Sequence, residues 1–181
     1  MPADPRPLLG EPVALDLLNT EWVQGGRPVD FFATPDGVAI WLATNGIDSP
    51  AGEPVREHLM AARSAIRSLL ERGDDADRRR LNDVLAHARV RVSVGDDGPE
   101  RTVEVDDPAW LPAALAAFDL VDLLTGRRDR IRRCAHPACV LWFLDTSRNG
   151  TRRWCSMATC GNRLKAQRHY DRARQQGAPG S

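Results

Sequence analysis

The four cysteines of this 181-residue chain all lie within 27 positions near the C-terminus, in two pairs of equal spacing. Cys134 and Cys139 enclose four residues, as do Cys155 and Cys160, and 15 residues (140–154) separate the pairs. We expect the connecting segment to form a hairpin, which would bring four thiolates around one tetrahedral centre. Zinc prefers that geometry, and four cysteines leave no open coordination position, so the pattern predicts one structural Zn²⁺.

Two other interpretations of these cysteines are open. They could be small buried apolar side chains, or they could be redox-active thiols. Their spacing differs, however, from the C-x-x-C motif of disulfide oxidoreductases. Nothing near Met1 resembles a signal peptide and no stretch approaches the length of a membrane span, so we expect a cytoplasmic protein whose paired cysteines bind metal. His136 is a candidate substitute ligand, although a surface or phosphate-contacting role fits it better.

Charge is distributed unevenly along the chain, although 25 Lys+Arg balance 25 Asp+Glu overall. Residues 126–176 contain 13 Lys+Arg and 3 Asp+Glu, a net charge of +10 (13 − 3), which leaves −10 for the remainder. A basic segment beside an acidic one indicates a nucleic-acid partner. The alternative is that these arginines pair with the acidic part or form a solvated face.

The first 126 residues are predicted to form an α+β domain that is mostly helical. Apolar residues recur at three- and four-residue steps over 53–72 and again over 108–124, which predicts two amphipathic helices. A further helix is expected over 75–88, and residues 34–36 provide a plausible helix start.

The remaining N-terminal segments are predicted to be a hairpin and loops. Valines alternate with polar residues on the two sides of a Gly-Asp-Asp-Gly-Pro turn, which predicts a half-buried β-hairpin over 90–105. Residues 12–20 fit either a short strand or a first helical turn, and 24–37 is expected to be loop.

One polar cluster in this domain is a candidate effector pocket, formed by Asp16, Asn19, Thr20 and Trp22. The alternative is a helix cap in which Asn19 and Thr20 bind backbone amides. Walker, G-x-G-x-x-G, G-x-S-x-G and H-E-x-x-H motifs are absent from the sequence, so no enzyme is expected.

The basic segment is predicted to continue into a helix over 162–176, which lacks Gly, Pro and β-branched residues. The order knuckle, hairpin, knuckle, helix resembles a treble-clef finger. We expect its aromatic residues to form a small core beneath the zinc, with base stacking as the alternative, and Asp145 to be structural. The candidate DNA contacts are Arg148, Asn149, Arg152 and Arg153 on the hairpin, and Lys165, Arg168 and Arg172 on one helical face.

The residues around the cysteines resemble the CGNR zinc-finger family. The sequence Cys-Gly-Asn-Arg occupies 160–163, and W-F-x-D-x-S-R-N at 142–149 and R-R-W-C-S-M at 152–157 match the family as well. The segment L-D-L-L-N-T at 15–20 is similar, more loosely, to the start of a stress-induced transcription regulator domain coupled to this finger. The resemblance implies DNA binding by a bacterial transcription regulator, with Asn162 and Arg163 either reading bases or supporting the zinc site.

We therefore expect a sensor or dimerisation domain (1–126), a zinc finger (127–176) and a disordered tail (177–181). A homodimer is expected because a single finger offers a small footprint on DNA. A small-molecule effector is a further expected partner. The rival interpretations are a zinc-stabilised protein-docking module and an RNA-binding accessory factor.

Overall fold

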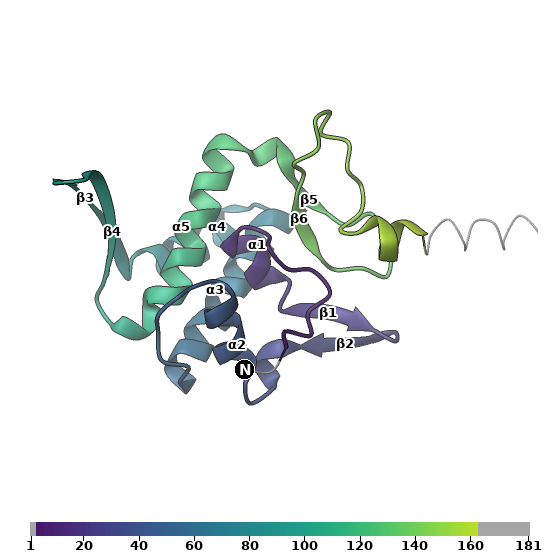
Figure 1. The fold of residues 1–181 in the computed structure, drawn as a ribbon, viewed down its shortest axis with the longest axis horizontal. Coiled ribbons are helices and arrows are strands. Elements are labelled where there is room, and N and C mark those ends of the chain that lie inside the picture. Colours follow the sequence, from purple (N-terminus) through teal and green to yellow (C-terminus); the bar gives the residue numbers. More distant parts are fainter. Residues whose placement is uncertain (1–2, 163–181) are drawn as a thin grey trace, which may run out of the picture.

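The computed structural model describes residues 3–162, which form a helical body with one hairpin at one end and the cysteine-bearing segment at the other (Figure 1). Several predictions fall on residues 163–181 and lie outside the described part of the chain. These are most of the helix over 162–176, the tail 177–181, and the candidate contacts Arg163, Lys165, Arg168 and Arg172.

The body is built on α1 (Val13–Leu18), α3 (Glu53–Glu71), α4 (Asp75–Leu85) and α5 (Leu111–Gly126). Helices α3, α4 and α5 pack on one another, and α1 packs against α3 and α5. Residues 14–18 of α1 are at most 1% exposed, as expected of a short helix that is apolar on most sides.

The helices predicted within the first 126 residues are confirmed with small changes at their ends. Within the segment 12–20, residues 13–18 form a helix (α1) and no strand, and α2 (Gly37–Thr44) begins just after the predicted start. The 75–88 prediction was three residues too long, because the chain turns into a strand at Ala88. The 108–124 helix begins with a 3₁₀ turn, η2 (Pro108–Trp110), before α5.

The prediction of loop over 24–37 was wrong for its first half. Strands β1 (Glu21–Gln24) and β2 (Arg27–Asp30) pair antiparallel around a two-glycine turn. Both glycines have positive φ (58° and 78°), the conformation that a tight hairpin turn needs and that side chains disfavour. A second short element, η1 (Phe31–Ala33), follows, and the Asp30 side chain accepts a hydrogen bond from the backbone N–H of Phe32.

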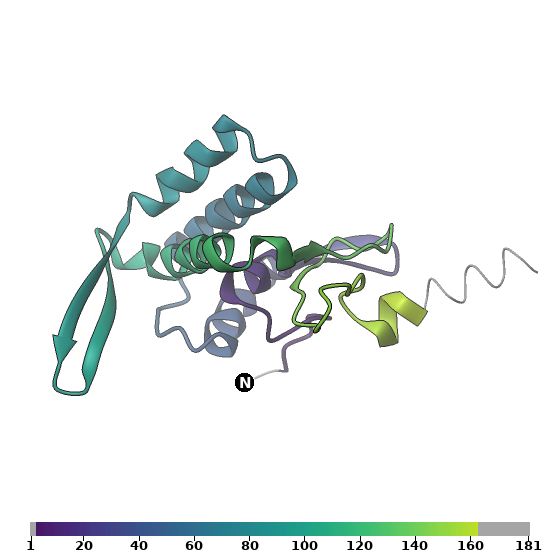
Figure 2. The same cartoon turned by 90° about the horizontal axis from the view of Figure 1, so that it is seen from above.

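The second predicted hairpin is confirmed as β3 (Ala88–Gly95) and β4 (Gly98–Val105), but its expected half burial was wrong. Val90, Val92 and Val94 are 40%, 64% and 83% exposed. In both views the hairpin projects from the helices and touches α4 and α5 near its base (Figures 1 and 2). Its alternation therefore marks an apolar face that the rest of the described chain does not cover.

One segment, Pro108–Gly126, is long and apolar enough to cross a membrane by length and composition alone, with a mean hydropathy of 1.4. In the fold it is a core helix, since Ala113, Ala116 and Leu120 are fully buried and the helix packs against α1, α3 and α4. Its Asp119 accepts a hydrogen bond of 2.8 Å from the N–H of Ala14, and burial raises the pKa of this carboxyl.

A continuous hydrophobic core joins the N-terminal helices to the segment expected as a separate zinc finger. The Asn19 side chain donates from Nδ2 to the carbonyl of Trp142 and accepts from its N–H through Oδ1, both at 2.9 Å. Glu11 accepts a bond of 2.8 Å from the N–H of Leu144. The division near residue 126 stays a prediction, but the two sides share buried contacts.

Candidate metal centre

The first cysteine pair lies in the turn of a short hairpin formed by β5 (Ile131–Arg133) and β6 (Trp142–Leu144). The N–H of Cys134 donates to the carbonyl of Leu141, and the N–H of Cys139 donates to that of His136, both at 2.9 Å. The hairpin thus spans 131–144. The predicted hairpin over 140–154 was wrong, because the β-prone residues pair backward across the first knuckle.

The segment after β6 contains no strand among the described residues 145–156. Hydrogen bonds to the Asp145 side chain hold its turn together. This 2%-exposed carboxylate accepts hydrogen bonds from the Ser147 hydroxyl (2.6 Å) and N–H (2.9 Å) and from the N–H of Arg152 (2.9 Å). These bonds, led by the hydroxyl of Ser147, hold the pKa of Asp145 below its usual range. The expected structural role of Asp145 is confirmed.

In the second cysteine pair, Cys155 precedes a single helical turn, η4 (Met157–Gly161), and Cys160 lies within that turn. The N–H of Cys155 points at the Sγ of Cys134 from 3.5 Å. Beside it, the N–H of Ala135 donates to the carbonyl of Arg153 at 2.9 Å. These contacts hold the two knuckles side by side.

The four sulfur atoms form one compact cluster, with all Sγ atoms within 4.8 Å of one another. The Sγ distances are 3.8 Å for Cys139–Cys155 and 3.6 Å for Cys155–Cys160. Tetrahedral zinc with Zn–S bonds of about 2.3 Å needs sulfurs roughly 3.8 Å apart, so the cluster fits the ion. The predicted structural Zn²⁺ site is confirmed as a four-cysteine set in the finger.

The thiols also interact strongly with one another. Hydrogen bonds from Cys139 and Cys155 lower the pKa of Cys134, while the bond to Cys134 raises the pKa of Cys139 to about 12. One thiolate is thus favoured at the expense of its neighbours, because like charges at this spacing repel. A divalent cation removes that conflict, so metal binding and full deprotonation are coupled.

His136 lies inside the first knuckle but outside the sulfur cluster. Its side chain is buried at 5% exposure, and its Nδ1 accepts a hydrogen bond of 3.2 Å from the N–H of Ala138. The expected surface or phosphate-contacting role was therefore wrong. The ring folds back into the knuckle that it helps to close.

The family comparisons agree with this geometry. The CGNR zinc finger family matches residues 130–173. A second family, ABATE, described as "Putative stress-induced transcription regulator", matches residues 11–127, which is more than half of the chain. The chain belongs to the ABATE family. No curated protein matches it at a significant level.

In this ABATE-family chain, the candidate DNA contacts of the finger fall into two groups. Arg148, Asn149, Arg153 and Asn162 are exposed. Arg152 differs, because its guanidinium lies 4.3 Å from the centre of the Phe143 ring and donates to the carbonyls of Trp154 and Cys155.

These contacts give the Arg152 side chain a structural role in holding the second knuckle, and its expected contact with DNA stays a prediction. The expected small core is confirmed for Trp142 and Phe143, which are 6% and 0% exposed. Trp154 is only half-buried, and the guanidinium of Arg153 lies 5.3 Å from its ring centre.

The predicted effector cluster near α1 is divided among structural roles. The Asp16 carboxylate binds the buried Arg6 guanidinium and accepts from Asn45 at 3.0 Å. Asn19 is the clamp on β6 described above. Thr20 donates to the carbonyl of Leu17 at 2.7 Å and accepts from Arg63 at 2.8 Å.

None of these three residues exceeds 1% exposure, and their side chains make contacts that hold the fold. Trp22 alone of the four lines a cavity, one that also touches Val140 of the first knuckle. The role of Arg63 was missed, although its place among the apolar positions of α3 was a signal. Its guanidinium donates to Asp30 at 2.7 and 2.8 Å.

The two N-terminal histidines pack against the same aromatic ring. His58 and His87 stack on opposite sides of Trp110, with ring centroids 3.7 Å and 3.8 Å from it. The Nδ1 of His87 also lies 2.9 Å from a carboxylate oxygen of Asp106. The stack ties the end of α4 and the base of the β3–β4 hairpin to α3.

Proposed function

We propose that this protein is a cytoplasmic, non-enzymatic transcription regulator whose zinc finger binds duplex DNA. The supporting observation is the group of exposed arginines on the finger and its leading segment that pair with no carboxylate within residues 3–162. These side chains are Arg127, Arg128, Arg132, Arg148 and Arg153. Arginine forks onto phosphate oxygens and guanine edges, so such a surface suits backbone and base contacts.

The alternative use of these arginines, pairing with the acidic N-terminal part, has little support. Arg133 lies 3.9 Å from Glu71, and Arg152 lies 3.9 Å from Glu11, both near the limit for an ion pair. The Arg133–Glu71 pair is exposed, and an exposed pair of this length contributes little free energy. Most of the positive charge on the described part of the finger is therefore available to a partner.

The proposal is tested by fluorescence anisotropy of the zinc-loaded chain with labelled duplex DNA over a salt series. Arg148→Ala and Arg153→Ala should each weaken binding and lower the slope of log K against log salt by roughly one. Arg79→Ala is the matched control, since it removes an arginine of α4 that is also exposed. The same assay tests the expected contacts of Asn162, Arg163, Lys165, Arg168 and Arg172.

Three results would overturn this function. Arg148 and Arg153 variants that behave like the Arg79 control would remove the finger surface from the contact. Tighter binding to RNA than to duplex DNA would favour the accessory-factor alternative. No binding to either nucleic acid at low salt would favour the protein-docking alternative.

We further propose that two copies associate through the β3–β4 hairpin, so that one dimer carries two fingers. The apolar residues of α3 and α5 are used largely in the core and leave little surface for an interface. The hairpin instead presents Val90, Val92 and Val94 on one face, and an isolated two-stranded hairpin is marginally stable without a partner surface.

Sedimentation velocity at micromolar concentration tests this association. Val92→Lys should yield monomers, because it places a charge in the middle of the apolar face. Ser93→Lys, on the opposite face of the same strand, is the matched control and should leave the dimer intact. A monomeric parent protein, with or without DNA, would overturn the proposal.

A further inference from the structure

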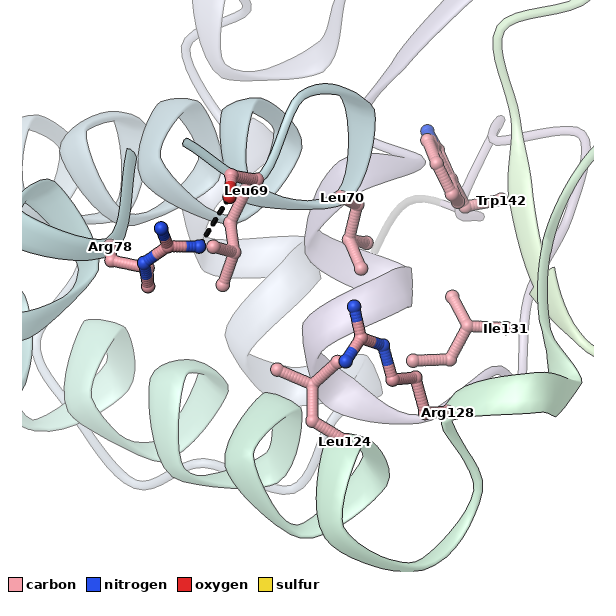
Figure 3. Close-up of a pocket in the computed structure, with 8 residues that line it drawn as sticks. Leu69, Leu70, Arg78, Leu124, Arg128, Ile131 and Trp142 are labelled. Carbon is pink, nitrogen blue, oxygen red and sulfur yellow. Dashed lines mark hydrogen bonds between the residues drawn. The ribbon is translucent and has the colours of Figure 1, made fainter. Parts of the chain in front are cut away.

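A cavity lies where the helical body meets the zinc-bearing hairpin, lined by residues of both (Figure 3). Its volume is about 360 Å³, within the range of small-molecule sites. Leu69 and Leu70 of α3, Leu124 of α5, Ile131 of β5 and Trp142 of β6 form its walls. Protein interiors are close-packed, so a space of this size between apolar side chains suits a ligand.

The polar side chains at the cavity carry positive charge only. Its lining includes Arg78 and Arg128 and no carboxylate. The guanidinium of Arg78 is occupied, because it donates to the carbonyl of Gly73 and to Asp75. Arg128 extends over the space between Leu70, Leu124 and Ile131 and forms no ion pair within residues 3–162 (Figure 3). An anionic group at the mouth would meet that free cation.

The cavity wall is continuous with the metal site. Ile131 pairs with Leu144 and Arg133 pairs with Trp142, so Ile131 and Trp142 lie on one face of the β5–β6 hairpin. Cys134 follows β5 directly and bonds to the carbonyl of Leu141, next to Trp142. A molecule held between this face and the helices would therefore fix the position of the first zinc knuckle relative to the body.

We propose that this cavity binds an amphipathic carboxylate, with an aliphatic or aromatic body among the leucines, Ile131 and Trp142 and its carboxylate paired with Arg128. We also infer that a bound ligand changes the DNA affinity of the finger, and this inference rests on the proposed function. This site replaces the effector pocket expected at Asp16, Asn19, Thr20 and Trp22.

Binding is tested first without DNA, by calorimetry on the zinc-loaded full chain with octanoate and 4-phenylbutyrate as probes. At least one probe should bind saturably with one site, and 1-octanol should bind more weakly than octanoate. Arg128→Gln should weaken carboxylate binding about fivefold, the effect of losing an exposed ion pair worth up to ~1 kcal/mol. It should leave the affinity for 1-octanol unchanged. Arg127→Gln, an exposed neighbour outside the lining, should change neither affinity.

The location is tested by filling the cavity. Leu124→Trp should abolish binding, whereas Val121→Trp, on the exposed side of the same helix, should preserve it. Circular dichroism and zinc content confirm that both variants fold. The site is refuted if neither probe binds, if octanoate and 1-octanol bind alike, or if Leu124→Trp binds as the parent does.

The coupling is tested separately, by DNA titration at saturating probe. The dissociation constant for duplex DNA should change at least twofold in the parent and remain constant in Leu124→Trp. A probe that binds without this change would refute the coupling. Saturable binding in a protein that does not bind DNA would refute the proposed function and leave the ligand site standing, so the two failures are distinguishable.

Discussion

The two hydrogen bonds between the Asn19 side chain and the backbone of Trp142 should couple the stability of the helical body to that of the zinc-bearing hairpin. The amide of Asn19 is fully buried and satisfies both the N–H and the carbonyl of Trp142, 123 positions away, at 2.9 Å each. Asn19→Ala removes both partners and leaves two backbone groups buried without a hydrogen bond. Water has little access to replace them, because Trp142 is itself only 6% exposed.

The expected loss of stability follows from these two orphaned groups. Each buried donor or acceptor left unsatisfied costs about 1–3 kcal/mol, so the variant should lose roughly 2–6 kcal/mol of unfolding free energy. That is a large part of the roughly 5–15 kcal/mol that stabilises an ordinary domain. Because β6 belongs to the common core, the loss should appear in the helices as well as in the finger.

Urea denaturation of the zinc-loaded protein measures this, followed by far-ultraviolet circular dichroism for the helices and by tryptophan fluorescence. Both transitions should move together to lower urea. Asn82→Ala is the control, since Asn82 is exposed on α4, and it should stay within about 0.5 kcal/mol of the parent. The reasoning fails if Asn19→Ala matches this control, or if the fluorescence transition shifts while the helical transition does not.

Three further outcomes are expected. Protein purified without chelator should contain one zinc per chain by mass spectrometry, and Cys155→Ser should lose the metal and the folded finger. Arg152→Ala should cost about 1–3 kcal/mol in urea denaturation through its lost bonds to two carbonyls, whereas Arg153→Ala should cost less than about 0.5 kcal/mol. Burial acts to raise the pKa of Asp30, but hydrogen bonds from Arg63 outweigh it and hold that pKa below its ordinary value. The stability from ionised Asp30 is complete above its unfolded pKa of about 3.9 and is lost as pH falls through the lower folded pKa. The gap in unfolding free energy to Asp30→Asn should therefore be widest near pH 7 and close in acid.

Local sequence patterns predicted the long helices and the sulfur ligands well. The three- and four-residue apolar repeats over 53–72 and 108–124 predict which face of each helix is buried. In the structure those faces lie in the core. The paired cysteines carry equally strong information, because few arrangements of two short knuckles satisfy a tetrahedral ion.

Predictions were less successful where the structure of a segment depends on which other segment of the chain it packs against or pairs with. The 140–154 hairpin was wrong because strand propensity does not say which neighbour a segment pairs with, and Trp142–Leu144 pairs with residues on the other side of the knuckle. The burial of β3 was wrong for a related reason. Alternating valines define an apolar face but not the surface that covers it.

The sequence by itself determined the helical body, the zinc ligands and the charge asymmetry, since each depends on residue type and short spacing. The tertiary structure alone decided which polar residues are free for function. Arg152 and Arg153 are adjacent and chemically identical, yet one is committed beneath the finger and the other is exposed. Asn19 became a clamp, and a cavity formed from Leu70, Leu124 and Trp142, because side chains distant in sequence meet only after the core has packed.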